Sequence, residues 1–355
     1  MKFFNLLAVI LAPFLFVCCE RDVAGTDSGE VLVSFDTKGL RAEAGEQGLT
    51  DADIASFNLK VNDSDGIVYD GAFGECPGTV TVKAGECSFS LRSRSYSGPE
   101  FDSPIYGDDK VVMVEAGKEF EVMLSCRQLT VGVQVLFSED FKENFPDGFI
   151  RLSCRDTLSG KEEYADYPYS ESGFCHFLPG IITVNLMKDR NSSPELLTGR
   201  ICSASDMFSV SVKLAPMEAY GTVKVSVDTA LLRYNETYPY GRRREGKTAF
   251  DAISVSELGN FDGDTIWVTG YISGCFVNKK WHPEIDSVTV TSNIALSPAL
   301  NSSSAWPVSI ASGKCRELNL KDFPQYLGER VAVRGVAGTL YDMDGIKKSL
   351  EYVLF

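Results

Sequence analysis

The chain has 355 residues, of which 44% are hydrophobic, and its net charge is −15 at pH 7. That hydrophobic content is ordinary for a globular protein, and the length is enough for two or three domains. The acidic balance excludes binding to nucleic acid through its phosphates, because such binding needs a basic surface.

The first twenty residues form the most distinctive segment of the chain. Lys2 precedes an apolar run over 3–17, and the doublet Cys18-Cys19 follows it. The run is shorter than the about 20 apolar residues that span a bilayer, and it is typical of a secretory signal peptide. The sequence therefore predicts export from the cytoplasm.

The end of this segment resembles the lipobox of bacterial lipoproteins, in which cleavage leaves a cysteine that receives a lipid. Cys19 is the favoured attachment site, because the small Cys18 would then stand before the cleavage point. Cys18 is the alternative, since Leu15 stands three residues before it. We expect a signal peptide over 1–19, a tether over 20–29 and a lipoprotein of the outer membrane that is exposed on the cell surface.

Eight cysteines remain after this doublet. An exported protein can oxidise them, and Cys76 with Cys87, and Cys275 with Cys315, are candidate disulfide pairs because they flank predicted strands. Buried thiols are an equally good interpretation, because cysteine packs as a small hydrophobic side chain. With two histidines and no C-x-x-C spacing, the sequence predicts no metal site and no cofactor.

Most of the chain alternates apolar and polar residues with the period of a β-strand. Turn-rich segments containing Gly, Asp and Lys separate these stretches, which predicts an all-β body of sandwiches. The clearest alternating stretches are 57–61, 120–124, 131–137, 208–212 and 223–227.

The segment 231–249 contains Tyr, Pro, Gly and the run Arg242-Arg243-Arg244, and it predicts a linker. Such an arginine run is usually solvated, although it can contact an anionic surface. After it we expect a short helix over 250–258 and a helical turn over 318–327. Strands are predicted at 264–276, 293–296, 306–310, 330–341 and 346–355. Five strands with a helical piece between the third and fourth is the order of an OB-fold barrel.

Two stretches also resemble known families. Residues 97–141, with Phe101–Gly107 and the strand that ends at Cys126, resemble an uncharacterised all-β domain of Bacteroidetes lipoproteins. That group is similar to the fimbrillin-like surface proteins. The resemblance covers 30–229 and implies immunoglobulin-like or transthyretin-like sandwiches, here 30–126 and 127–230, in a structural or adhesive setting.

The C-terminal stretch resembles a second uncharacterised module of the same bacteria. The residues that carry this resemblance are Ile266–Gly274, Asn293–Leu296, Trp306–Val308 and 318–331. It implies an OB-like five-stranded barrel over 250–355, and it supplies no functional residue.

A ligand-binding face is predicted on this module. Trp267 and Tyr271 alternate with aliphatic residues, so they should lie outside the barrel, with Trp281 and Arg334 nearby. OB folds bind ligands on such a face with aromatic side chains, which indicates a glycan or protein ligand. The alternative is that these aromatics pack against the 250–258 segment or another domain.

No constellation of residues indicates catalysis. Cys175 and His176 are adjacent, and neighbours in a strand point to opposite faces, so they should not act as a nucleophile and base. The sequence predicts a non-enzymatic surface lipoprotein with a structural or adhesion-type binding role, tied to the membrane by its lipid. The alternatives are a glycan-binding accessory lipoprotein of a polysaccharide-uptake system and a fimbria-associated component.

Overall fold

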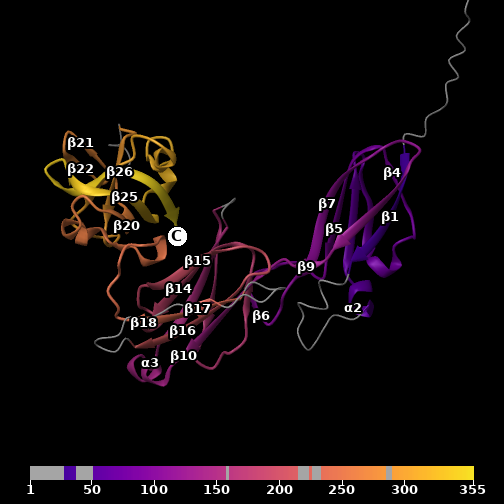
Figure 1. The fold of residues 1–355 in the computed structure, drawn as a ribbon, viewed down its shortest axis with the longest axis horizontal. Helices are drawn as coiled ribbons and strands as arrows, with labels where there is room; N and C mark the ends of the chain where they lie inside the picture. The colour runs from indigo at the N-terminus through magenta and orange to yellow at the C-terminus, as the bar shows by residue number, and fades with distance from the viewer. Residues whose placement is uncertain (1–27, 37–50, 157–159, 215–223, 226–232, 285–289) are drawn as a thin grey trace, which may run out of the picture. The chain divides into compact units, whose positions relative to one another are not determined.

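The computed structural model describes residues 28–36, 51–156, 160–214, 224–225, 233–284 and 290–355 (Figure 1). Within these residues the protein is all-β, with short helical turns between its strands. Among them no helix combines the length and the apolar character that a bilayer crossing requires. The predicted lipid-attachment residues Cys18 and Cys19 lie outside the described residues.

The first compact unit contains the described parts of 28–36, 52–91 and 109–124. Its strands belong to two sheets, of order β4-β1-β8 and β3-β2-β5-β7-β9, as in a β-sandwich. Alternate residues are buried, for example Leu59 and Val61 on β2 and Phe89 and Leu91 on β5. The elements of these two sheets and their turns are β1 (Ser28–Asp36), α2 (Asp51–Ala55), β2 (Asn58–Asp63), β3 (Gly66–Ala72), η1 (Phe73–Glu75), β4 (Val80–Lys83), β5 (Gly85–Arg92), β7 (Tyr106–Val114), β8 (Glu119–Ser125) and β9 (Arg127–Gln128), of which β9 is assigned to the second unit.

The second unit begins with another sandwich, whose sheets have the order β17-β18-β16-β10-β13-β6 and β12-β11-β14-β15. A single hydrophobic core that includes Val133, Leu152, Val184 and Phe208 joins the two sheets. The elements are β6 (Glu100–Phe101), β10 (Val131–Phe137), α3 (Glu139–Asn144), β11 (Phe149–Arg155), β12 (Glu162–Tyr167), β13 (Cys175–Phe177), β14 (Gly180–Met187), β15 (Glu195–Cys202), β16 (Met207–Leu214), β17 (Lys224–Val225) and β18 (Arg233–Tyr240).

Two boundaries differ from the sequence prediction. Strand β18 lies inside the predicted linker 231–249, because Tyr238 is buried in the second sandwich and Tyr240 packs edge-on against Phe145. Residues 92–108 join the second unit, where β6 pairs with β13, although the prediction placed them in the first sandwich. The connection after the second sandwich is therefore shorter than predicted.

The C-terminal module follows and belongs to the same compact unit. Strand β20 pairs with both β23 and β25, so β20, β23, β24, β26 and β25 form a closed ring. The expected helix over 250–258 is instead two 3-10 turns, and η5 and η6 lie between β24 and β25. The elements are η2 (Ala249–Asp251), β19 (Ile253–Ser254), η3 (Val255–Asn260), β20 (Thr265–Ile272), β21 (Cys275–Val277), β22 (Lys280–His282), β23 (Asn293–Ser297), β24 (Trp306–Ser309), η5 (Lys314–Leu318), η6 (Pro324–Tyr326), β25 (Arg330–Leu340) and β26 (Met343–Leu354).

Candidate functional site

The predicted ligand-binding face lies on β20 and β25. Their antiparallel register places Trp267 opposite Arg334 and Tyr271 opposite Arg330. Directly opposite residues of two paired strands project to the same side of a sheet. Trp267, Tyr271 and Arg334 therefore share one face of the sheet.

That face is covered at its centre, and this corrects the prediction. Trp267 is only 9% exposed and packs in a cluster with Ala249, Ala252 and Ala332. Half-buried Phe250 and Phe355 pack against the same cluster. The η2 segment at the start of the module thus packs with the indole ring, so Trp267 is a packing residue and not an open stacking surface.

The neighbouring Tyr271 is half-buried beneath a cation. The Arg330 guanidinium lies 6.0 Å from the centre of the Tyr271 ring and 5.6 Å from that of Phe355. Burial lowers the pKa of Arg330, and the nearby positive charge of Arg244 acts in the same direction, while Tyr271 opposes both. This arginine is half-buried between aromatic rings at the junction.

The remaining two residues of the predicted face lie apart from this cluster. Trp281 is on β22, outside the ring of strands, and its Nε1 donates a hydrogen bond of 2.9 Å to the carbonyl of Ser273. Arg334 is exposed and forms an ion pair with Glu351 at 2.8 Å. The structure therefore does not bring all four predicted residues together at one site.

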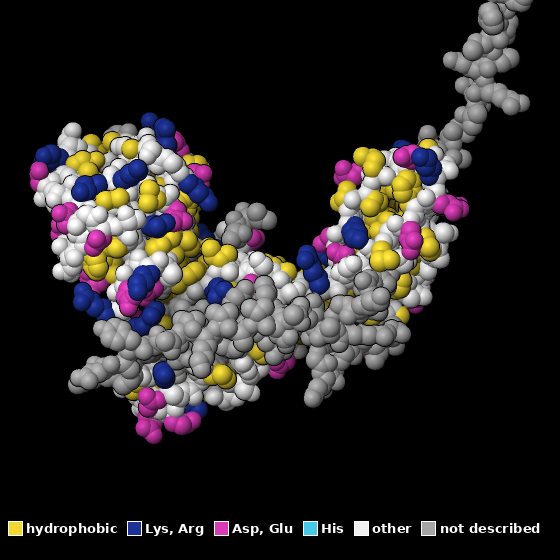
Figure 2. All heavy atoms as spheres, in the orientation of Figure 1, with side chains coloured by type: hydrophobic (Ala, Val, Ile, Leu, Met, Phe, Trp, Pro, Cys, Tyr) yellow, Lys and Arg dark blue, Asp and Glu magenta, His cyan; other side chains and the backbone are white. Residues whose placement is uncertain are grey.

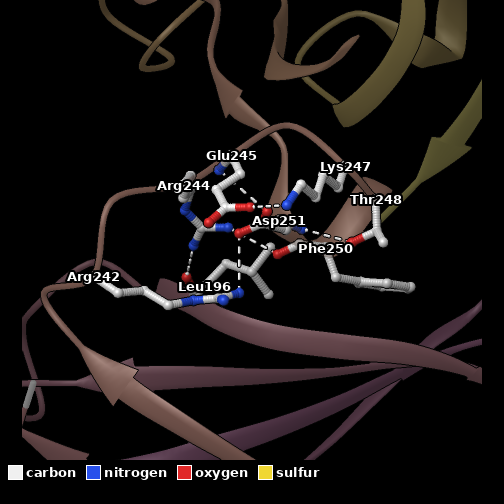
Figure 3. A network of polar contacts seen from close by, with 8 residues as sticks. All are labelled: Leu196, Arg242, Arg244, Glu245, Lys247, Thr248, Phe250 and Asp251. Atoms are coloured by element: carbon white, nitrogen blue, oxygen red, sulfur yellow. Dashed lines mark hydrogen bonds and ion pairs between the residues drawn. The ribbon is translucent and has the colours of Figure 1, made fainter. Parts of the chain in front are cut away.

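A polar network fixes the connection between the second sandwich and the C-terminal module (Figure 3). Arg244 donates from Nη1 to the carbonyl of Phe250 at 2.8 Å, and from Nη2 to the carbonyl of Leu196 on β15. Arg242 forms an ion pair of 2.9 Å with Asp251, which also accepts from the backbone N–H of Glu245. Two arginines of the predicted solvated run therefore have partners in the protein, although Arg242 itself stays exposed.

We expect Arg244→Lys to destabilise the C-terminal module by roughly 1–3 kcal/mol, because one ammonium cannot reach both carbonyls and one would lose its partner. All three tryptophans of the chain lie in this module, at 267, 281 and 306. Urea denaturation followed by tryptophan fluorescence measures its free energy of unfolding. The matched control is Arg243→Lys, because Arg243 is the adjacent residue and is exposed. Equal stability of the two variants would contradict the bridging role of Arg244.

The C-terminal module contacts the outer face of sheet β12-β11-β14-β15. A Cβ added to Gly199 on β15 would lie 2.5 Å from the Phe250 ring. Because real Cβ contacts are not that short, only glycine allows the ring to approach this strand. The residues Ser153, Thr183 and Asn185 on this outer face are buried, although they point away from the sandwich core. These three positions of the outer face are thus covered, whereas Tyr164 and Ile201 on the same face stay exposed.

A second contact lies at the ends of β11 and β25. Arg155 Nη1 is 2.6 Å from Glu329 Oε2 and donates to the carbonyl of Phe355 at 2.6 Å. The Arg155 side chain is 15% exposed and that of Glu329 is 35% exposed. This pair joins residues that are 174 positions apart in the sequence.

A groove of about 580 Å³ opens beside the Arg155–Glu329 pair. Its sandwich side includes Ile181 and Ile201, and its C-terminal side includes Tyr326 and Tyr352. The volume falls within the roughly 300–1,000 Å³ of small-molecule sites. Sequence reasoning missed this groove, because its two sides come from distant segments that have no common motif.

The predicted disulfide pairs are not formed in this structure. Cys76, Cys87 and Cys315 are free thiols, so neither Cys76–Cys87 nor Cys275–Cys315 is bonded. Burial raises the pKa of the Cys87 thiol, whose Sγ lies 3.5 Å from the carbonyl of Lys83. The packing of buried thiols, which the sequence left open as an equal alternative, is the arrangement seen here.

Cys175 and His176 are both buried in the second sandwich. Burial raises the pKa of Cys175 to about 12 and lowers that of His176 to about 4. His176 Nδ1 lies 3.2 Å from Thr130 Oγ1. A thiol that stays protonated at neutral pH is a poor nucleophile, so this pair is structural. Within the described residues no group of three or more His, Cys, Asp or Glu side chains is placed to hold a metal ion.

Comparisons with solved structures return proteins of Bacteroidetes among others. The fimbrial anchor protein Mfa2 from Porphyromonas gingivalis is 12% identical, with a TM-score of 0.31, and the match covers 50% of this chain and 83% of that one. A "putative adhesin" from Bacteroides ovatus is 8% identical, with a TM-score of 0.33 and coverage of 49% and 75%. A structure described as "putative polysaccharide binding proteins" from Bacteroides thetaiotaomicron is 9% identical, with a TM-score of 0.30, and the match covers 49% of this chain and 80% of that one. Each of these names belongs to the matched protein and is not a name for the present chain.

No curated protein matches the chain. Residues 253–355 match the family described as Domain of unknown function (DUF6359). Residues 30–239, which are more than half of the chain, match the family described as Domain of unknown function (DUF4493). The two matched segments overlap the two stretches, 30–229 and 250–355, that resemble uncharacterised modules of Bacteroidetes lipoproteins. The chain therefore belongs to the family described as Domain of unknown function (DUF4493).

Proposed function

We propose that this chain is a non-enzymatic, adhesion-type binding protein, held on the outer surface of the outer membrane by a lipid on Cys19. The observation that carries the proposal is the groove at the junction of the second sandwich and the C-terminal module. Two β-modules joined by the partly buried contacts of Arg244 and Arg155 form a concave surface there. The export segment over 1–19 supports the location, because it ends at the cysteine doublet.

The proposal includes a division of the chain by role. Residues 1–19 are removed or lipidated, 20–29 form the tether, and the two sandwiches form the body. The C-terminal module is proposed to be an OB-like barrel. The closed ring of five strands supports this, as does the position of η5 and η6 between the third and fourth of them.

The test of this proposal is metabolic labelling of the full chain with an alkyne fatty acid in its native bacterium. We expect Cys19→Ser to lose the label and to leave the membrane fraction, while the matched control Cys18→Ser keeps both. Proteinase K added to intact cells should degrade the wild-type protein. Labelling that survives Cys19→Ser, or a chain that is protected from the protease until the cells are lysed, would refute the proposal.

A further inference from the structure

One side of the groove offers an apolar surface. Ile181 on β14 and Ile201 on β15 are cross-strand partners, and both line the groove. The Ile201 side chain is 58% exposed. An exposed branched aliphatic side chain beside a concavity gives a ligand an apolar contact. The backbone of the strand that carries this side chain is already fixed by the sheet.

The opposite side offers two aromatic rings that the protein holds in place. The Tyr352 hydroxyl donates a hydrogen bond of 2.9 Å to Glu317. The Tyr326 ring lies nearly parallel to that of Phe323, with centroids 5.8 Å apart and an angle of 27° between the rings. Both tyrosines are half-buried and line the groove, and the Lys314 Nζ lies 5.9 Å from the centre of the Tyr352 ring.

The charges of the groove are balanced. Arg155 and Lys314 face Asp156 and Glu329 among the lining residues, and Arg155 is already paired with Glu329. Basic and acidic side chains are also interspersed over the molecular face drawn in Figure 2. The groove therefore has no excess of one sign to attract a strongly charged polymer, while it offers both donors and acceptors.

We propose that the groove binds a neutral oligosaccharide. Such a ligand has apolar CH faces that fit the isoleucine and tyrosine surfaces, and hydroxyl groups that both donate and accept hydrogen bonds. This inference rests on the proposed binding function and adds the chemical class of the ligand. It also moves the site from the predicted Trp267 face, which is covered, to a groove formed by two modules.

The test uses the full chain and isothermal titration with cellotetraose, mannotetraose, xylotetraose and maltotetraose, with tetragalacturonic acid as the acidic comparator. At least one neutral tetrasaccharide should bind, and more tightly than the acidic one. Ile201→Asp and Tyr352→Ala should each weaken that binding at least tenfold. Tyr164→Ala is the matched control, because Tyr164 is 61% exposed and lies outside the groove lining.

Ile201 is exposed, so Ile201→Asp should keep the wild-type melting temperature, and a loss of binding in that variant then reports on the groove. Failure of every neutral tetrasaccharide to bind would overturn the inference. Preference for the acidic comparator, or wild-type affinity in both groove variants, would also overturn it. If Cys19 is labelled with lipid but none of the tetrasaccharides binds, only the assignment of the ligand is wrong. If Cys19 is not labelled, the proposed surface role is wrong, whatever the result of the titration.

Discussion

Replacing Trp267 by alanine should destabilise the C-terminal module by about 3–5 kcal/mol, the usual cost of removing a large buried aromatic side chain. The indole packs against Ala249, Ala252 and Ala332, and small side chains cannot move far enough to fill the space it leaves. Urea denaturation followed by the fluorescence of Trp281 and Trp306 measures the effect.

The matched control is Arg334→Ala on the same face of β20 and β25. Arg334 is exposed and its ion pair with Glu351 is solvated, so the loss should stay below about 1 kcal/mol. If Trp267 were an open ligand platform, Trp267→Ala would leave stability nearly unchanged and would abolish ligand binding. That outcome would contradict the packing described here.

The second large effect is a loss of stability in mild acid that depends on His176. Burial holds the pKa of this imidazole at about 4, below its unfolded value of about 6.5. Between these values the unfolded chain binds a proton that the folded chain does not bind, so stability falls as the pH falls. The full contribution is about 3 kcal/mol, present above pH 6.5 and lost by about pH 4.

The variant His176→Asn keeps a polar atom within reach of Thr130 but does not titrate. Scanning calorimetry between pH 4.5 and 7.5 should show a shallower dependence of melting temperature on pH for this variant than for the wild type. Carboxylates contribute equally to both proteins, so the difference isolates the histidine. Identical slopes would show that His176 is accessible to protons in the folded protein.

The strand pattern of the chain was predictable because one face of most strands is buried and the other is exposed. The stretches 131–137 and 208–212 coincide with β10 and β16, whose alternate residues enter one core. The predicted strands of the C-terminal module overlap its five ring strands, but the predicted strand 264–276 is divided into β20 and β21, which belong to different sheets. The predicted helix over 250–258 differs, because its turns are the tighter 3-10 kind.

The candidate site was not predictable, because it depends on contacts between modules. Alternation correctly placed Trp267 on the outer face of β20, but it carries no information about what covers that face. The groove needs Arg155 at the end of β11 to meet Glu329, and nothing in either local sequence indicates the other. Gly199 likewise lies in an ordinary strand sequence, and a Cβ there would be excluded both by the Phe250 ring of the other module and by the carbonyl of Ile182 on the neighbouring strand.

The central claim is that the second sandwich and the C-terminal module form one body with a groove at their junction. A double-mutant cycle on the free energy of unfolding with Arg155→Leu and Glu329→Gln tests it most directly, because these residues belong to different modules and are in contact at 2.6 Å. We predict a coupling energy of about 1 kcal/mol or more between the two substitutions. Effects that add to within about 0.3 kcal/mol would mean that the side chains do not interact, and would contradict the docked arrangement and the groove with it.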